Sequence, residues 1–420
     1  MSKLPNMSGD LLSLCLRNGF ITKSTEGLYS YGPLGAELRR NLRSFWWQEM
    51  VTSKGSVNGV EISSFSRNIS INNAKSDSKN TSNKGSGKSY QIVDTQKLIK
   101  RFKNLLQTNE IRDVDLKSCF EENFFGHSLS LPALDGIVDE GLNMISNLSH
   151  TGNLIQLPYG LAWCGKYYNM CDNASNSFQE EEYLNLLFTC SDVHAQHWSN
   201  FWNRCRLTWW KKIANVPSNF MLLDQSNDIS NNNGNMEIKY DVQAFQDPLD
   251  TIKKMTGDSL DGDIINCLTT HDGTSLLLIQ ISTSLDQAFS ALMTDAFKEK
   301  ELADSCGHVS VRPVLNLHPL VAPVKVSLVL EDASKKDLME VSHQLATELR
   351  QAGINVTCED SATPEECYGY NDGIGTPYCI TIMESTLSNG IIAFRSRDTT
   401  LQEYLHISDV LNTVQQHIGM

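Results

Sequence analysis

The pattern of apolar residues changes near Pro319, and this change constrains the fold more than any other feature of the chain. Before it, strand-like runs at 184–189, 236–245 and 274–281 mix with helical stretches at 194–213 and 284–297. Because strands and helices do not alternate strictly, this pattern favours an antiparallel sheet with helices over a doubly wound parallel fold. We therefore predict an α+β fold for residues 1–318.

Beyond Pro319 the chain reads strand, helix, strand over 324–330, 334–352 and 354–358. Two later strand-like runs enclose Asn389-Gly390, a dipeptide typical of β-hairpin turns in which both central residues have positive φ. The pattern predicts a second, smaller α/β domain over 319–420.

Two stretches interrupt the first domain. Residues 53–89 are rich in Ser, Asn, Gly and Lys, which is typical of a flexible loop. Helical periodicity over 94–107, 113–125 and 134–148 predicts a helical insertion spanning 92–150.

Composition excludes several classes of protein. The formal net charge of −14 means that the molecule as a whole repels a phosphate backbone, so any contact with nucleic acid must come from local patches. Eleven cysteines without a Cys-x-x-Cys pair argue against a disulfide framework and against the usual zinc sites. No apolar run approaches the roughly 20 residues of a membrane helix, so we expect a soluble protein with no membrane partner.

The first 20 residues resemble neither a mitochondrial transit peptide nor a secretory signal, so a targeting segment is expected to be absent or to have been removed. His194 and His197 share a helical face, but they lack His-Glu-x-x-His spacing and a third ligand. We expect a structural or surface role for them, with no metal and no cofactor.

Several segments resemble glycyl-tRNA synthetases and follow that family's order along the chain. They are Tyr31-Gly32-Pro33-Leu34-Gly35-Ala36-Glu37-Leu38 with Trp46-Trp47, Leu157-Pro158-Tyr159-Gly160-Leu161-Ala162, Ile374-Gly375-Thr376-Pro377-Tyr378-Cys379 and Arg397-Asp398-Thr399. Other segments more narrowly resemble the accessory-subunit family of mitochondrial DNA polymerases. These are Phe201-Trp202, Arg206-Leu207, Trp209-Trp210, Pro217-Ser218-Asn219-Phe220, Leu317-His318-Pro319, Ala322-Pro323, Lys325-Val326 and 395–400 with His406-Ile407-Ser408.

The resemblance implies a class II aminoacyl-tRNA synthetase-like antiparallel sheet domain with a helical insertion, followed by an anticodon-binding-like domain. It also shows which catalytic residues are replaced. Asn169 and Cys171 stand where the synthetases have an arginine and a glutamate, and Gln287 and Ser284 stand where they have a second arginine and a glycine. Lys166 is the only nearby cation, and it lacks the bidentate geometry of arginine.

Adenylation needs cations on the ATP phosphates, because charge develops there in the transition state. Each preorganised donor contributes about 3–4 kcal/mol, so losing two lowers the rate on the order of 10⁴-fold or more. We expect no enzyme activity. Two alternatives remain open, a divergent glycyl-tRNA synthetase and a synthetase-derived RNA-binding protein.

The resemblance implies a processivity factor that binds the polymerase's catalytic subunit and primed double-stranded DNA in the mitochondrial nucleoid. It places a homodimer contact in 92–150 and the polymerase contact in 319–420. Basic residues on two predicted helices are the candidate DNA contacts, although ordinary solvent-exposed helix faces carry the same residue types. The candidates are Arg39, Arg40, Arg43, Arg204, Arg206, Lys211 and Lys212. Charge pairing with Asp398 or Glu403 is an equal explanation for two of the candidate partner contacts, Asn389, Gly390, Arg395 and Arg397.

Two further features bear on DNA binding. The family's basic loop corresponds here to 171–182, which contains three glutamates and no Lys or Arg. A basic stretch over 84–103 is an alternative place for DNA binding to that loop. We expect Trp202, Trp209 and Trp210 to be core residues rather than platforms for bases.

Overall fold

The computed structural model describes residues 7–23, 29–62, 66–67, 89–91, 129–132, 137–150, 156–170, 178–224, 235–240, 248–256, 276–303, 309–359 and 363–419. They form two compact units: unit 1 holds 56–195 and 253–282, and unit 2 holds 2–55, 196–252 and 283–420. Helices and mixed sheets in both confirm the α+β class. The predicted domain boundary at 318/319 stays a prediction, and the expected helices at 94–107 and 113–125 lie outside the described residues.

Unit 1 is built on a sheet whose order is β3-β7-β8-β12-β11. β7 and β8 pair antiparallel from Tyr159↔Thr189 to Met170↔Phe178, whereas β3 runs parallel to β7 at the edge. The predicted antiparallel pairing is thus present between β7 and β8, with a parallel pair of β3 and β7 beside it. The strands are β3 (Val57–Gly59), β7 (Tyr159–Met170), β8 (Phe178–Ser191), β12 (Leu276–Ser284) and β11 (Asp250–Thr256). Of β12, the residues up to 282 belong to unit 1, and of β11, the residues from 253 on.

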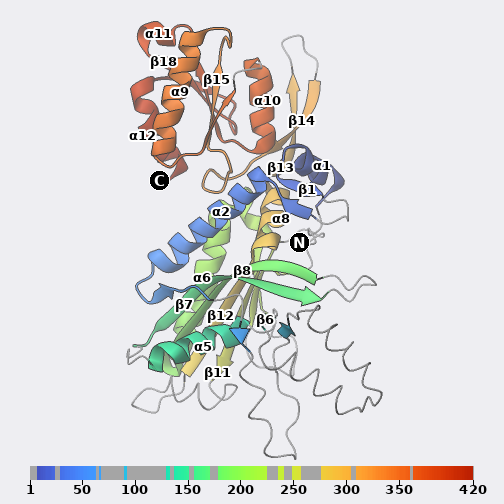
Figure 1. Ribbon diagram of the computed structural model, residues 1–420, viewed down its shortest axis with the longest axis vertical. Coiled ribbons are helices and arrows are strands. Elements are labelled where there is room, and N and C mark those ends of the chain that lie inside the picture. The colour runs from blue at the N-terminus through green and yellow to red at the C-terminus, as the bar shows by residue number, and fades with distance from the viewer. Residues whose placement is uncertain are drawn as a thin grey trace, which may run out of the picture. The chain divides into compact units, whose positions relative to one another are not determined.

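Helix α5 (Ile137–His150) confirms the third helix predicted for the insertion, with a start three residues later. Its apolar face, with Ile137 and Ile145, packs on Trp163 and Leu187 of the sheet (Figure 1). Because α5 uses this face within unit 1, the face is not available to a second subunit.

A small sheet of order β4-β6-β5 comprises β4 (Ser66–Arg67), β6 (Leu129–Pro132) and β5 (Ser89–Gln91).

Unit 2 begins with a close approach of two chain segments. A Cβ on Gly32 would collide with the carbonyl oxygen of Gly19, and one on Gly35 would collide with that of Phe20. Pro33 then starts a helix at a position where its missing N–H costs nothing. The elements are α1 (Gly9–Arg17), β1 (Ile21–Lys23), β2 (Tyr29–Tyr31), α2 (Pro33–Trp47) and a π-helical turn (Gln48–Thr52) that extends α2.

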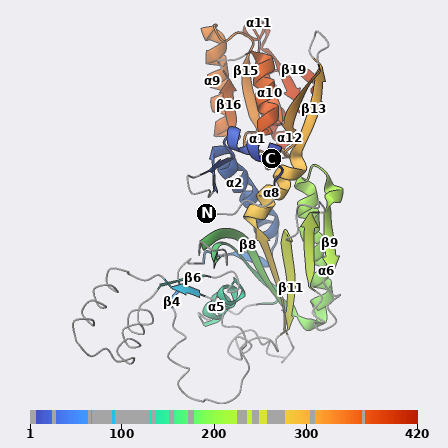
Figure 2. The same cartoon turned by 90° about the vertical axis from the view of Figure 1, so that its right-hand side faces the viewer.

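The long helix α6 (Ala195–Ile213) carries the aromatic core of this unit (Figure 2). Trp202, Trp209 and Trp210 are at most 2% exposed, which confirms that they are core residues. Trp209 stacks on Phe45 of α2 with ring centroids 5.7 Å apart, and Trp210 stacks on Phe220. The neighbouring elements are β9 (Phe220–Asp224) and β10 (Met236–Tyr240), which pair antiparallel, and α8 (Leu285–Ala296).

The last part of unit 2 contains a five-stranded sheet of order β16-β15-β17-β18-β19. β15 pairs parallel with β16 and β17, and β18 pairs antiparallel with β17 and β19. Helices α9 and α12 cover one face and α10 the other (Figure 1). The elements are β15 (Val326–Leu330), α9 (Lys336–Gln351), β16 (Val356–Glu359), α10 (Pro364–Ile374), β17 (Tyr378–Ile382), β18 (Ile391–Ser396), β19 (Gln402–His406) and α12 (Val410–Ile418). An antiparallel hairpin of β13 (Phe297–Ala303) and β14 (Val309–Leu315) precedes it.

The predicted Asn389-Gly390 turn needs correction. β17 and β18 do pair antiparallel, but a one-turn helix, α11 (Thr386–Asn389), lies between them. Only Gly390 has positive φ, at 70°, because it caps that helix in the left-handed conformation. Asn389 instead accepts a hydrogen bond from the Ile391 N–H through its side chain.

Candidate functional site

The start of α8 carries two of the replaced synthetase positions. Ser284 caps the helix, and its hydroxyl oxygen accepts a hydrogen bond from the Gln287 N–H. Between them, Asp286 is buried and pairs with Arg39 of α2. The hydroxyl of Tyr31 donates to the same carboxylate at 2.6 Å, and the Arg39 guanidinium lies 4.1 Å from the centre of the Tyr31 ring. The charge of Arg39 is therefore neutralised by Asp286.

A second buried arginine is neutralised in the same way. Arg206 of α6 and Asp250 have fully buried side chains and pair at 2.7 Å. Arg206 also donates to the hydroxyl of Thr283 at 3.0 Å, and Thr283 donates to Asp250 at 2.6 Å. The guanidinium lies 4.6 Å from the centre of the Trp209 ring. Each of the three side chains hydrogen-bonds to the other two, whereas Nη1 of Arg206 has no hydrogen-bond partner among the described residues.

These contacts correct two of the candidate DNA contacts. Arg39 and Arg206 are buried and paired with carboxylates, so neither presents its charge to solvent. A phosphate could reach Arg206 only if the core around it opened. Their role is to stabilise the fold of unit 2.

The first pair of replaced positions lies in unit 1. Asn169 is in β7, and Cys171 lies outside the described residues. Lys166, the cation nearest to them in sequence, pairs with Glu180 across β7 and β8 at 2.7 Å. Its positive charge is therefore balanced by a carboxylate.

The remaining candidate cations are at the surface of unit 2. Arg40 is exposed and pairs with Glu37 one turn earlier, and Arg43 is half-buried. Arg204, Lys211 and Lys212 are exposed on α6, where Lys212 pairs with Glu49 at 2.7 Å.

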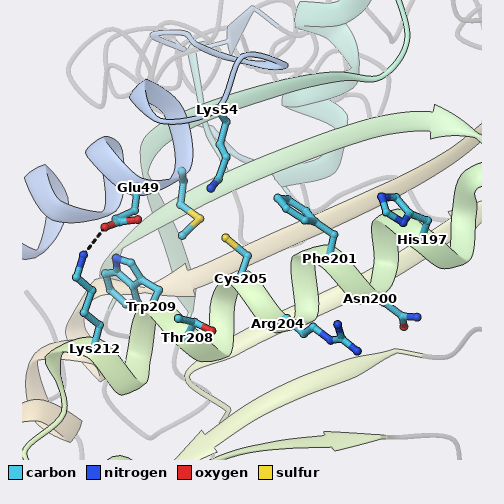
Figure 3. Close-up of a pocket in the computed structure, with 11 residues that line it drawn as sticks. Glu49, Lys54, His197, Asn200, Phe201, Arg204, Cys205, Thr208, Trp209 and Lys212 are labelled. Carbon is cyan, nitrogen blue, oxygen red and sulfur yellow. Dashed lines mark hydrogen bonds and ion pairs between the residues drawn. The ribbon is translucent and has the colours of Figure 1, made fainter.

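Arg204 and Lys212 belong to one pocket of about 500 Å³ (Figure 3). One wall is α6 and the other is the π-helical turn and the residues that follow it. Lys54 reaches over the Phe201 ring from that second wall, with its ammonium 5.7 Å from the ring centre. The lining residues are Glu49, Met50, Lys54, His197, Asn200, Phe201, Arg204, Cys205, Thr208, Trp209 and Lys212.

Sequence reasoning found Arg204 and Lys212 but missed Lys54, His197 and the pocket itself. The signal was partly present, because 197, 201, 204, 205, 208 and 212 follow the spacing of three and four that defines one helix face. Nothing local indicated that the turn carrying Lys54 faces that side of α6. Lys211 is exposed but does not line the pocket.

The two histidines considered as metal ligands are exposed: His194 ends the short 3-10 turn before α6, and His197 lies in the first turn of α6. In the described part of the chain, no group of three or more His, Cys, Asp or Glu side chains is placed to hold a metal ion. No helix among the same residues is both long and apolar enough to span a membrane.

The candidate partner contacts also need correction. Arg395 is 7% exposed and forms two hydrogen bonds of 2.9 Å with the carboxylate of Asp372. Arg397 is 2% exposed and donates to the carbonyl oxygens of Gly375 and Leu317. Arg395 thus ties β18 to α10, and Arg397 ties the residue after β18 to the segments that follow α10 and β14, so both guanidinium groups are engaged within unit 2. Arg397 also pairs with Asp398 at 2.8 Å, which confirms one of the two charge pairings proposed as the alternative.

A different part of the C-terminal sheet presents apolar groups to solvent. β19 is the last strand in the sheet order, so one of its edges has no neighbouring strand among the described residues. Tyr404 within it and Leu401 just before it are 67% and 68% exposed. We call this surface, Leu401 to His406, the β19 edge.

Comparisons with known proteins agree with the resemblance predicted from the motifs. A family model for the anticodon binding domain matches residues 320–417. The chain is 27% identical over 436 residues to DNA polymerase subunit gamma-2, mitochondrial, of Xenopus laevis, covering 97% of this chain and 87% of that protein. It is 27% identical to DNA polymerase subunit gamma-2 of Mus musculus, covering 97% of this chain and 90% of that protein. It is also 27% identical to glycine--tRNA ligase of Nocardia farcinica, covering 95% and 93%.

Proposed function

We propose that this chain is the non-catalytic accessory subunit of a mitochondrial DNA polymerase. In this role it binds the catalytic subunit and strengthens that enzyme's hold on primed DNA. The observation that carries the proposal is the loss of both phosphate-binding arginines in a chain that otherwise keeps the synthetase-like motifs. Similarity to the gamma-2 subunits over 97% of the chain supports it.

Identity alone does not separate the subunit from the ligases, since both are about equally similar to this chain. The chemistry of the site favours the accessory subunit. Adenylation requires cations that are free to meet the ATP phosphates, and Asn169 and Gln287 supply none. The buried arginines of unit 2, Arg39 and Arg206, do not replace them because each is already paired with a carboxylate. Releasing either would leave that carboxylate buried and unpaired, at a cost of about 3–5 kcal/mol.

The β19 edge is our candidate for contact with the catalytic subunit. An unpaired strand edge offers backbone hydrogen bonds to an extended partner segment, and exposed apolar side chains add affinity. Tyr404 and Leu401 are such side chains. Asn389, which is exposed, and Gly390 remain part of this proposal, whereas Arg395 and Arg397 do not.

DNA contact is assigned to the exposed cations Arg40, Arg204, Lys211 and Lys212, with Arg43 beside them. The homodimer contact is assigned to 92–150, outside the apolar face that α5 uses within unit 1. The name of the Xenopus relative supports a mitochondrial location, and we propose the matrix and nucleoid within it.

Primer extension by the matching catalytic subunit, with and without this chain, tests the proposal. We expect longer products and weaker salt inhibition when the chain is present. Unchanged product length at moderate salt would refute the accessory role. A parallel ATP–pyrophosphate exchange assay with glycine should give no turnover above background, and turnover at a normal synthetase rate would show an enzyme instead.

The contact surface is tested separately. Tyr404→Ser combined with Leu401→Ser should weaken binding to the catalytic subunit by at least tenfold while the chain stays folded, because both side chains are already solvent-exposed. Leu223→Ser, at another exposed leucine of unit 2, is the matched control. Equal effects of the two changes would remove the β19 edge from the proposal.

A further inference from the structure

We propose that the pocket between α6 and the π-helical turn binds one nucleotide of single-stranded nucleic acid. Its base would stack on Phe201 and its phosphate would lie between Lys54 and Arg204. The inference rests on the proposed DNA-binding role for its choice of ligand. It adds a site for unpaired nucleotides that the resemblance and the comparisons do not assign.

Charge makes the pocket suitable for a phosphate. It is lined by the cations Lys54, Arg204 and Lys212 and by one carboxylate, Glu49, which already pairs with Lys212. Within the described ranges, neither Lys54 nor Arg204 forms an ion pair. The chain as a whole carries a net charge of −14, so an excess of positive charge in one concavity is a local arrangement that favours an anion.

The thiol in the middle of the pocket does not offset that charge. Burial raises the pKa of Cys205 above its ordinary value of 9.0, and the opposing effect of the Lys54 ammonium is smaller. The group is therefore neutral near pH 7 and leaves both cations available.

The aromatic wall makes the pocket suitable for a base. Phe201 is half-buried and held edge-on by Trp198 and Trp202, with ring centroids 5.4 and 5.2 Å away. Its ring is thus fixed in orientation, as a stacking platform must be. Lys54 lies over that ring, and its long, flexible side chain would let the ammonium move onto a phosphate while the base takes its place.

A hydrogen-bond donor points to a ligand independently of charge. Trp209 is 2% exposed, and its indole N–H has no hydrogen-bond partner among the described residues although the ring lines the pocket. A buried donor without an acceptor is unfavourable, and a ligand with an acceptor atom would satisfy it. Phe45 stacks on this ring and Arg206 lies over it, so we assign Trp209 a donor role and the stacking role to Phe201.

Size and polar groups favour a nucleotide over other anions. A volume of about 500 Å³ lies within the roughly 300–1,000 Å³ of sites that take small organic ligands, and a duplex cannot enter it. Asn200 and Thr208 also line the pocket on the α6 wall and carry hydrogen-bond donors and acceptors. An acidic peptide would satisfy the cations but would leave these groups and the Phe201 face unused.

The test uses the full chain and a fluorescently labelled 20-residue oligothymidylate, with affinity measured by anisotropy over a range of salt concentrations. We expect Lys54→Ala and Arg204→Ala each to weaken binding about tenfold at low salt and to reduce the salt slope by about 0.7, the value for one phosphate contact on a single strand. Lys298→Ala, at an exposed lysine of β13 outside the pocket, is the matched control and should leave the affinity within twofold.

A base-free oligonucleotide distinguishes stacking from general attraction. Phe201→Ala should weaken binding of oligothymidylate about tenfold and should leave binding of an abasic strand of the same length unchanged. A structural disturbance would weaken both. Equal losses for the two strands, or a loss in Lys298→Ala as large as in Lys54→Ala, would overturn the proposal.

Two further outcomes keep this inference separate from the proposed function. If a glutamate-rich peptide binds the pocket and oligothymidylate does not, the site takes acidic peptides and the inference is wrong. If the pocket variants bind oligothymidylate normally but primer extension is still stimulated by the chain, only the inference fails. If single-strand binding behaves as expected but primer extension is not stimulated, only the accessory role fails.

Discussion

Replacing Arg206 with methionine should lower the free energy of unfolding by about 3–5 kcal/mol, because it leaves the Asp250 carboxylate buried and unpaired. Both side chains are fully buried, and Thr283 is the only other hydrogen-bond partner of the pair within the described cluster. Asp250→Asn should lower the free energy of unfolding by a similar amount, because the buried Arg206 charge then has no counter-ion. Methionine keeps the length and the apolar stem of arginine, so lost packing contributes little.

Arg204→Met is the matched control, because Arg204 lies two residues away on the same helix but is exposed. Its effect on stability should stay within about 0.5 kcal/mol. The double change Arg206→Met with Asp250→Leu should cost much less than the sum of the single changes, because a buried ion pair replaced by apolar residues leaves no charge behind.

Urea unfolding followed by tryptophan fluorescence measures these effects directly, since Trp209 lies beside Arg206. The free energies of Arg206→Met, Asp250→Leu and the double change form one double-mutant cycle with the unchanged chain. If Arg206→Met and Arg204→Met cost the same, Arg206 does not stabilise the core as argued. Additive single changes would show that Arg206 and Asp250 act independently.

Three other changes test separate parts of unit 2. Burial lowers the pKa of Lys325 from 10.5 to about 7, so the unfolded chain binds more protons than the folded chain between those pH values. The free energy of unfolding should therefore rise as the pH increases from 7 towards 10. Urea titrations at several pH values measure this rise, and Lys325→Met should abolish it. Gly35→Ala should destabilise the fold by more than 2 kcal/mol in the same assay, because its Cβ would collide with the Phe20 carbonyl, whereas the exposed Gly9→Ala should have little effect. Asp372→Asn should lower the melting temperature markedly by leaving the Arg395 guanidinium buried without a counter-ion, and an unchanged melting temperature would contradict the role given to that pair.

Much of the fold could be predicted from the chain because the signals are local. The spacing of apolar residues located α6, α8, α9 and β15 to within a few residues, since helix and strand periods are set by backbone geometry. The prediction of a hairpin turn at Asn389-Gly390 was wrong because the same dipeptide also suits the end of a short helix, where glycine is the C-terminal cap.

The sequence by itself determined the kind of fold and placed asparagine and glutamine at positions 169 and 287, because both depend on which residue type stands at which position. The tertiary structure decided which cations are available. Arg204 and Arg206 look alike in sequence, yet a helix turns by about 200° over two residues. One side chain therefore reaches a surface pocket, and the other meets Asp250, 44 positions away in the chain. Only long-range packing makes that distinction, and it also brings Lys54 to the pocket.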